Sequence, residues 1–307
     1  MFFTRTISFI VSLFLVVLTQ GSYAWGAHGH NITAELAYGL LTPATIQRLH
    51  RDFNIRTMEE FRRIANYADE IKAHHEYAWS YELHYTDVDA VPRTRCVLNL
   101  SMDCVGDRCV VGAVRNYTQR LGNESEIDDL WFLVHFIGDI FQPFHMGYAS
   151  DRGGNTIHVI YPSTESHLAS KHTNLHAVWD THMIEQAIFE TGGGDVEDFV
   201  RTIPIHHYAN HFNTAEEVGN DSLGLLCRRR LYMDGGILLK DGATLSPEYY
   251  NTNIQTVIDQ LAYSAHYMAY VLNEWGESVA GQMTAFMGVY QFTPDDYHHS
   301  SHLSRLE

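Results

Sequence analysis

The chain places a histidine and an aspartate four residues apart in two separate segments. His135 and Asp139 form the first pair, and His176 and Asp180 form the second. Residues four apart share one face of a helix, and a charged side chain on a buried apolar helix needs a partner. A hydrogen bond within the core would explain one such pair. Two pairs, with His145 shortly after the first, favour a metal centre, because imidazoles and carboxylates are usual zinc ligands.

Eight side chains are candidate metal ligands. They are His30, Asp69, His84, His135, Asp139, His145, His176 and Asp180. If Trp25 becomes the N-terminus, its amine and its carbonyl oxygen add a chelating pair close to His30 in sequence. Together these donors suffice for two or three zinc ions with three or four ligands each, and the lack of cysteine favours catalytic over structural zinc. The alternative is that several of these histidines cap helices or fill the core.

The net charge of the chain is −17 at pH 7, and no track of Lys and Arg could follow a phosphate backbone. Such a surface repels nucleic acid in general, so any attraction for a polyanion has to be local. A zinc cluster supplies it, because Asp69, Asp139 and Asp180 neutralise only part of its charge. Two ions about 3.5–4 Å apart also activate a shared water and stabilise an in-line displacement at phosphorus. The ligand set therefore predicts hydrolysis of phosphate esters.

Residues 1–24 are predicted to be a signal peptide. Arg5 gives a positive start, Ile7 to Leu18 is an apolar run of twelve residues, and Ala24 ends a segment suited to cleavage. The run is too short to span a bilayer, and no later segment is a transmembrane candidate. We therefore expect a secreted or luminal protein.

The cysteines and glycosylation motifs fit such a compartment. Four cysteines allow three disulfide pairings, and their spacing does not favour a zinc site. They are Cys96, Cys104, Cys109 and Cys227. The Asn-x-Ser/Thr motif marks candidate glycosylation sites. These are Asn99, Asn116, Asn123 and Asn220. Asn31 carries the motif as well, but it lies in the proposed metal region, so we do not expect it to be modified.

Helical periodicity dominates the chain and predicts one all-α domain over residues 25–276, with a small β-hairpin and long loops. Helices are expected at 31–41, from 43 onward, at 57–71, 110–121, 175–189 and 253–275, and in a central segment that Ser125 caps. Residues 83–87 are expected to be extended, 96–109 to be a loop, and 156–161 to be a strand. Residues 277–307 form a tail without a pattern, and its role is unknown.

The sequence resembles the S1/P1 nuclease family of secreted trinuclear-zinc nucleases that act on single-stranded nucleic acid. The resemblance covers residues 25–275, which is essentially the whole predicted domain. It is carried by Trp-Gly-x-x-Gly-His at 25–30, Ala-Asp-Glu at 68–70, Leu-His-x-x-Asp at 83–87, His-Phe-Ile-Gly-Asp-x-x-Gln-Pro-x-His at 135–145, Gly-Gly-Asn at 153–155 and Asn-Leu-His-x-x-Trp-Asp at 174–180. Zinc phospholipase C shares the N-terminal Trp and the helical architecture, and it is the alternative enzyme. A zinc-binding protein without catalytic activity is the other alternative.

The resemblance implies three zinc ions and assigns their ligands. One ion would be held by Asp69, His84, His135 and Asp139, a second by His145, His176 and Asp180, and a third by Trp25 and His30 with Asp139 as a bridge. In the family, a water between the bridged pair attacks phosphorus and the remaining ion stabilises the departing 3′ oxygen. The products are 5′-phosphorylated, and 3′-phosphates are removed from mononucleotides.

The resemblance also implies roles for side chains beyond the metal ligands. Lys72 would neutralise the transition state beside the catalytic carboxylates Asp69 and Asp139. As an isolated lysine it would instead be read as exposed surface. The base pocket would consist of Tyr85, Asp87 and Asn174, although Asp87 could instead orient a ligand histidine. The implied disulfides are Cys104–Cys109 and Cys96–Cys227. The substrates would be single-stranded nucleic acid and 3′-nucleotides, and we expect a monomer.

Overall fold

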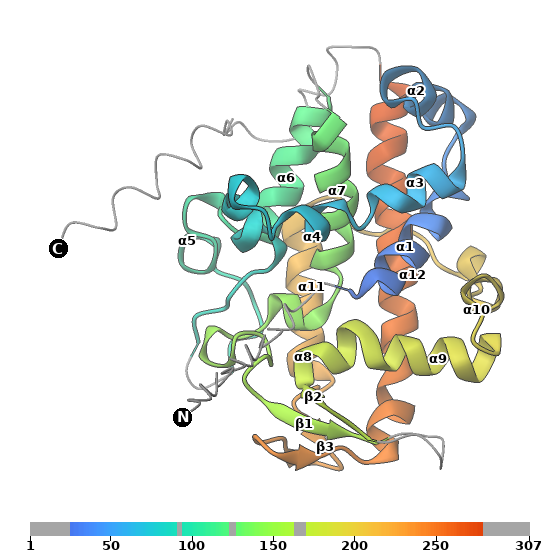
Figure 1. The fold of residues 1–307 in the computed structure, drawn as a ribbon. Helices are drawn as coiled ribbons and strands as arrows, with labels where there is room; N and C mark the ends of the chain where they lie inside the picture. Colours follow the sequence, from blue (N-terminus) through green and yellow to red (C-terminus); the bar gives the residue numbers. More distant parts are fainter. Residues whose placement is uncertain (1–24, 91–93, 123–126, 163–169, 279–307) are drawn as a thin grey trace, which may run out of the picture.

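The computed structural model describes residues 25–90, 94–122, 127–162 and 170–278 (Figure 1). Helices dominate this part of the chain, which confirms the predicted fold class. The α-helices are α1 (Ala27–Tyr38), α2 (Pro43–Phe53), α3 (Met58–Ile64), α4 (Tyr67–Ile71), α5 (Leu100–Asp103), α6 (Val110–Leu121), α7 (Ile127–Ile140), α8 (Leu175–Ala177), α9 (Met183–Gly192), α10 (Val196–Thr202), α11 (Ala215–Arg228) and α12 (Pro247–Glu277).

Shorter elements connect and extend these helices. The 3₁₀ helices are η1 (His75–His84), η2 (Val105–Asp107), η3 (Pro143–Met146), η4 (Ala149–Asp151) and η6 (Ile205–His207), and η5 (Val178–His182) is a turn of π-helix. The strands are β1 (His158–Tyr161), β2 (Lys171–Asn174), β3 (Met233–Asp234), β4 (Ile237–Leu238) and β5 (Ala243–Thr244). The predicted signal peptide, the Ser125 cap and nearly all of the predicted tail lie outside the described residues.

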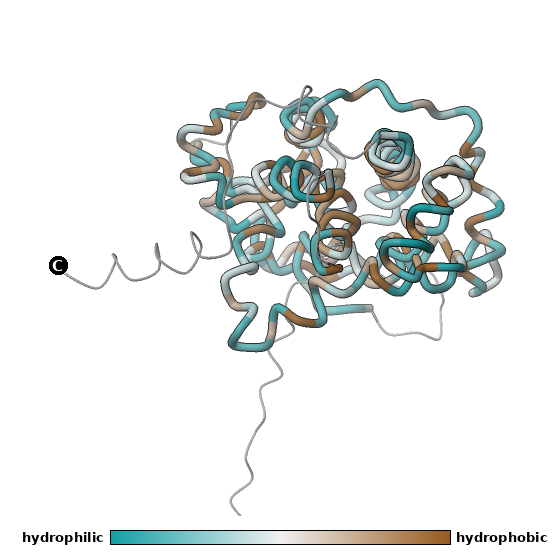
Figure 2. Tube along the Cα trace, turned by 90° about the horizontal axis from the view of Figure 1, so that it is seen from above, coloured by the Kyte–Doolittle hydropathy of each residue, from teal (hydrophilic) through white to brown (hydrophobic). Residues whose placement is uncertain are grey.

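Helices α12 and α7 form the centre of the molecule. The 31-residue α12 runs along the whole fold and packs against α1, α2, α7 and α9 (Figure 1). It is longer at both ends than the predicted helix over 253–275, and Pro247 at its first turn suits the earlier start. The α7 helix is buried on nearly every side, so its apolar residues pack against neighbours all around. The hydrophobic residues, brown in Figure 2, lie mainly between the helices.

The helix predicted over 57–71 is two helices, which corrects the sequence prediction. Thr57 and Glu60 form the expected capping box at its start, but the helix breaks at Ala65 and Asn66. The break leaves the Ala65 carbonyl outside the intrahelical hydrogen bonds, and that oxygen accepts from His135 Nδ1 at 2.7 Å. A local interruption of α3 therefore supports a residue on α7.

Other segments also differ from the prediction. Residues 83–84 end the 3₁₀ helix η1, and only the residues after them are extended. There the backbone N–H groups of Thr86 and Val88 donate to the carbonyls of His145 in η3 and of Gly147 just after it. The segment predicted as one helix over 175–189 continues to Gly192 and contains the π-turn η5. The loop over 96–109 holds the short helices α5 and η2. The first helix begins at Ala27, four residues before its predicted start.

The predicted strand near residue 160 is half of a hairpin. Strands β1 and β2 pair antiparallel, and β5 joins the other edge of β1 in parallel. The hairpin lies beside α8 and α9 (Figure 1). Disulfides join Cys96 to Cys227 and Cys104 to Cys109, the pairing that the resemblance implied. Among the described residues, no helix combines the length and the apolar character that a membrane span requires.

Candidate metal centre

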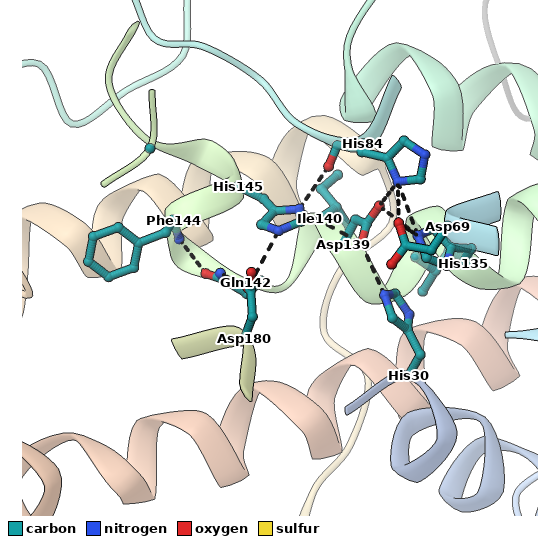
Figure 3. A network of polar contacts seen from close by, with 12 residues as sticks. His30, Asp69, His84, His135, Asp139, Ile140, Gln142, Phe144, His145 and Asp180 are labelled. Atoms are coloured by element: carbon teal, nitrogen blue, oxygen red, sulfur yellow. Dashed lines mark hydrogen bonds and ion pairs between the residues drawn. The ribbon is translucent and has the colours of Figure 1, made fainter. Parts of the chain in front are cut away.

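The eight candidate ligand side chains come from seven different elements or turns and converge inside the fold. Groups of donor atoms that lie within 4.8 Å of one another are formed by His30 with His135 and Asp139, by Asp69 with His84 and His135, and by His145 with His176 and Asp180. All eight side chains are buried. Figure 3 shows His30, Asp69, His84 and His135 gathered around Asp139, with His145 and Asp180 to one side.

The first cluster surrounds one carboxylate oxygen of Asp139. Asp139 Oδ2 lies 3.0 Å from His84 Nδ1 and 3.3 Å from His135 Nε2. Asp69 Oδ1 is 3.5 Å from each of the same two nitrogens. Two imidazoles and two carboxylates therefore present four donor atoms to one point, which is the ligand number of a tetrahedral zinc site.

The other oxygen of Asp139 faces a different histidine. His30 Nε2 lies 3.2 Å from Asp139 Oδ1, and the His30 ring stacks on the His135 ring with centroids 3.9 Å apart. Gly138 makes this approach possible, because a Cβ at that position would lie only 2.5 Å from His30 Nδ1. Asp139 therefore points one oxygen into each of two neighbouring donor groups.

The second cluster combines a 3₁₀ turn with the α8–η5 segment. His176 Nε2 is 3.1 Å from Asp180 Oδ2, and His145 Nε2 is 3.6 Å from Asp180 Oδ1. Gln142 donates from Nε2 to Asp180 Oδ1, and its own Oε1 accepts from the backbone N–H of Phe144. Gln142 thus ties the turn that carries His145 to the carboxylate that faces it.

Backbone carbonyls fix the orientation of three ligand histidines. His135 Nδ1 donates to the carbonyl of Ala65. His145 Nδ1 donates to the carbonyl of His84 at 2.8 Å, and His176 Nδ1 donates to the carbonyl of Gly153 at 2.6 Å. Each bond fixes the imidazole ring with Nε2 directed into a cluster, which is the usual orientation of metal-binding histidines.

Unsatisfied buried atoms test whether these residues fit a metal. Among the described residues, His30 Nε2, Asp139 Oδ1, His145 Nε2 and Asp180 Oδ2 are buried and make no hydrogen bond. Buried polar atoms are rarely left in this state, because the lost solvation costs about 1–3 kcal/mol each. All four atoms face the clusters, so the donor set fits bound cations.

In the first cluster, the charge of each ionisable side chain shifts the pKa of its neighbours. Burial lowers the pKa of His84 to about 4. Burial also disfavours protonated His135, but the carboxylates of Asp139 and Asp69 offset it and raise the pKa of His135 to about 10. Burial works against ionised Asp69 and Asp139 too, yet the neighbouring imidazoles, His135 foremost, hold the pKa of both carboxyls below the usual range. Both carboxylates are therefore ionised, which is the form that binds cations.

The start of the described chain lies against the second cluster. Trp25 is fully buried, and the N–H of Gly26 donates to the carbonyl oxygen of Asp180 at 2.7 Å. A Cβ on Gly26 would lie 2.6 Å from Thr181 Oγ1, so the two segments are in close contact. From there α1 carries His30 to Asp139.

The chain is similar to known nucleases over most of its length. A profile of the S1/P1 nuclease family matches residues 25–277. The chain is 30% identical to Endonuclease 4 of Arabidopsis thaliana over 85% of this chain and 92% of that protein. It is also 30% identical to Nuclease P1 of Penicillium citrinum, over 81% and 97% of the two chains, and 26% identical to Nuclease S1 of Aspergillus oryzae, over 89% and 97%.

This chain belongs to the S1/P1 nuclease family. Membership in the S1/P1 nuclease family makes the protein a nuclease, a hydrolase of phosphate esters. The family profile spans every residue of the three donor groups.

Lys72 lies at the edge of the first cluster of this S1/P1 nuclease. Its Nζ is 2.6 Å from Asp69 Oδ1, and only 10% of the side chain is exposed. Burial disfavours the charged form, but the carboxylate of Asp69 more than offsets this and raises the pKa of Lys72. The lysine is not the exposed surface residue of the alternative interpretation. It is a cation held beside a predicted metal ligand.

The predicted base-pocket residues come from two segments of the chain. Tyr85 and Asp87 alternate with the buried Thr86, so in this extended segment they point to the same, partly exposed side. Burial raises the pKa of Tyr85 to about 12 and also raises the pKa of Asp87, an effect that Arg152 partly opposes. Asn174 ends β2, and its Oδ1 accepts from the backbone N–H of Ala177 at 2.8 Å, which caps α8.

Several residues that build the site were not assigned this role from the sequence. Gln142 was visible only as part of the motif around His145, and nothing local indicated that it reaches Asp180. The supporting carbonyls of Ala65 and Gly153 carry no sequence signal, because every residue has a carbonyl. Gly138 was the one detectable clue, since a glycine inside an apolar helix often marks a close approach.

The candidate glycosylation sites differ in exposure. Asn99 is exposed, whereas Asn116 is buried in α6. The Asn220 amide accepts from the N–H of Leu98 and donates to the carbonyl of Glu216, at 2.9 and 2.8 Å. Asn123 lies outside the described residues. Glycosylation stays a prediction at all four sites, and exposure favours Asn99.

Proposed function

We propose that this S1/P1 nuclease is a zinc-dependent endonuclease that cleaves single-stranded DNA and RNA to 5′-phosphorylated products and also removes 3′-phosphates from mononucleotides. The observation that carries the proposal is the pair of oxygens of Asp139, which face two adjoining donor groups, with a third donor group close by. The relatives named nuclease P1 and nuclease S1 support the substrate class.

Three zinc ions are proposed, held by eight side chains and the N-terminus. Asp69, His84, His135 and Asp139 would hold the first, and His145, His176 and Asp180 the second. His30 and the amine and carbonyl of Trp25 would hold the third, with Asp139 shared between it and the first. Zinc in such positions supplies an activated water and positive charge for a phosphate.

The protein's own side chains would place the substrate. Lys72 is a charged donor fixed beside Asp69, and it would contact an oxygen of the reacting phosphate. Tyr85 offers an aromatic face for a base, and Asp87 offers hydrogen-bond acceptors for the base edge. Asn174, which caps α8, would present its amide nitrogen to the same strand.

Processing and location belong to the same proposal. Residues 1–24 would be removed as a signal peptide, and the two disulfides suit the oxidising compartment that secretion provides. The residues after 276 would form a tail outside the catalytic domain. We propose that the protein acts as a secreted monomer.

The test compares substrates and metal states of the mature protein. We expect rapid cleavage of single-stranded DNA and RNA, much slower cleavage of duplexes, release of phosphate from 3′-nucleotides, and loss of all activities after chelation with recovery on adding Zn²⁺. Mass spectrometry of the fragments should show 5′-phosphates. Activity that survives chelation would contradict the zinc assignment, and release of phosphocholine from phospholipid without strand cleavage would indicate a phospholipase C instead.

A further inference from the structure

A groove on the β1–β2 hairpin lies beside the metal centre, and apart from Asn174 its lining has no role in the chemistry described above. Its volume is about 440 Å³, which is within the range of ligand-binding pockets. It is lined by His158, Val159, Ile160, His172, Thr173, Asn174 and Gly242.

The strand register places four of these side chains on one face. Directly opposite residues of an antiparallel pair share a face of the sheet. His158 is opposite Asn174, and Ile160 is opposite His172. Both histidines are exposed, and the other two side chains are partly buried. The groove is therefore the open face of the hairpin, with two imidazoles, an aliphatic side chain and an amide.

The opposite face of the hairpin is closed by the segment that contains η5 and α9. The Tyr161 ring stacks on the His182 ring with centroids 5.8 Å apart, and His182 Nε2 lies 3.1 Å from Thr173 Oγ1. Lys171 Nζ lies 2.6 Å from Glu185 Oε2 on the same side. These contacts hold the hairpin against the helix, so its open face is a supported surface.

His158 is held at the rim of the groove. Its Nδ1 lies 2.7 Å from Asp241 Oδ1, and its backbone N–H donates to the same oxygen at 2.9 Å. The N–H of Gly242 donates to the His158 carbonyl at 2.8 Å. These bonds orient the imidazole while 71% of the side chain stays exposed. A ring fixed in this way loses little entropy when it binds a planar group.

The groove is continuous with the metal centre through β2. Asn174 lines the groove and caps α8, and His176 of the second cluster follows two residues later. The N–H of Leu175 donates to the carbonyl of Ile157 at 2.9 Å, which fixes this junction to the start of the hairpin. Asn174 and Leu175 therefore connect the groove directly to the segment that carries His176.

The chemistry of the lining selects the ligand. None of its seven lining residues is acidic, although the whole chain carries a net charge of −17, and the carboxylate of Asp241 at the rim is paired with His158. Imidazole rings stack on nucleobases whatever their sequence, and an amide bonds to polar groups on a base edge. We propose that the groove binds a further nucleotide of a single-stranded substrate, beyond the one at the metal centre, by stacking its base on His158 and His172. The proposal rests on the proposed nuclease activity.

The test compares a groove variant with a matched surface variant. The groove variant is His158→Ala/His172→Ala, and the control is His206→Ala/His207→Ala, which removes two exposed imidazoles from η6. The readout is the ratio of kcat/KM for a single-stranded oligonucleotide to kcat/KM for a 3′-mononucleotide, which is too short to reach the groove. We expect this ratio to fall about tenfold in the groove variant, the loss of one stacked base, and to hold in the control. His172→Phe keeps a planar ring and should retain most of the ratio.

Other results would overturn the proposal. The groove has no binding role if the ratio is unchanged in the groove variant, if both substrates lose activity in parallel, or if His172→Phe behaves like His172→Ala. If the wild-type protein cleaves no single strand, the proposed function fails separately. In that case, the affinity of the zinc-loaded protein for a fluorescent, phosphorothioate-linked single strand tests whether the groove binds a nucleotide. Weaker binding by the groove variant than by the control supports it, and equal binding overturns it.

Discussion

The two histidine–aspartate pairs have the same spacing but different surroundings. In the regular helix α7, His135 Nε2 lies 3.3 Å from Asp139 Oδ2, and across the π-turn η5, His176 Nε2 lies 3.1 Å from Asp180 Oδ2. Both histidines donate from Nδ1 to a backbone carbonyl. Taken alone, the two pairs are equivalent metal-binding motifs.

Their neighbours make them different. Both oxygens of Asp139 face imidazoles, those of His84 and His135 on one side and that of His30 on the other. One oxygen of Asp180 is occupied by Gln142. The motif therefore determines where a histidine–aspartate pair lies, whereas the residues from other elements determine how many ions that pair can bind.

Replacing each aspartate by asparagine gives the largest expected contrast. Asp139→Asn removes a charge that two proposed ions share, so zinc should fall from about three to about one per chain and activity by on the order of 10³-fold or more. Asp180→Asn should remove only one ion. Elemental analysis of the purified proteins measures the metal, and circular dichroism checks the fold. Equal zinc loss in the two variants would contradict a bridging Asp139.

A residue retained before Trp25 should weaken zinc binding only at the proposed site that includes His30. A mature protein that begins Met-Trp25 has an amide in place of the free amine, and an amide nitrogen is a poor zinc donor. We expect about two zinc ions per chain and activity lower by about 10²-fold. The same protein with Met removed by an aminopeptidase serves as its control. Three ions and full activity in the extended form would show that the amine is not a ligand.

Gly138→Ala should disturb the contact between His30 and α7. The added methyl group would meet His30 Nδ1 at 2.5 Å, so the ring has to shift away from Asp139. We expect zinc at the His30 site to bind about 10- to 100-fold more weakly, with the second cluster unaffected. Competition with a chelating dye measures the affinities. Gly39→Ala is the matched control, because its nearest contact would be a carbonyl at 3.5 Å.

Gln142→Leu should have the smallest effect and should act on the other cluster. The variant keeps the side chain's size but removes the donor to Asp180 and the acceptor for the N–H of Phe144. We expect zinc at the second cluster to bind about tenfold more weakly, while the Asp139 sites keep their affinity. The same dye competition gives both values. Loss of affinity at all sites together would mean that Gln142 supports the fold and not Asp180.

The sequence predicted the parts of the fold that depend on local signals. The α6 helix begins and ends as expected because Gly122 follows a periodic apolar segment, and the Thr57–Glu60 capping box starts α3 as expected. The break at Ala65 was missed, because the acceptor it frees is used by a residue seventy positions away. The π-turn within 178–182 was missed for a similar reason, since nothing local distinguishes it from an α-helix.

The candidate site was predicted to a similar extent. His135 with Asp139 and His176 with Asp180 were found because their spacing repeats. His30, which carries no such spacing, was included through its position near Trp25, and the structure brings it to Asp139. The orienting carbonyls and the groove on the hairpin depend on strand register and chain reversal. No residue type marks those features, so they needed the three-dimensional structure.

The bond between Cys96 and Cys227 divides the ligands into two sets. It closes a covalent ring that contains His135, Asp139, His145, His176 and Asp180, while His30, Asp69 and His84 lie on the N-terminal arm outside it. Closing a ring of this size stabilises a fold by about 4–5 kcal/mol in the chain-entropy view. Oxidation would therefore restrict the unfolded chain most in the segment that carries these five ligands. We therefore expect a reducing environment to weaken cation binding by the same sequence.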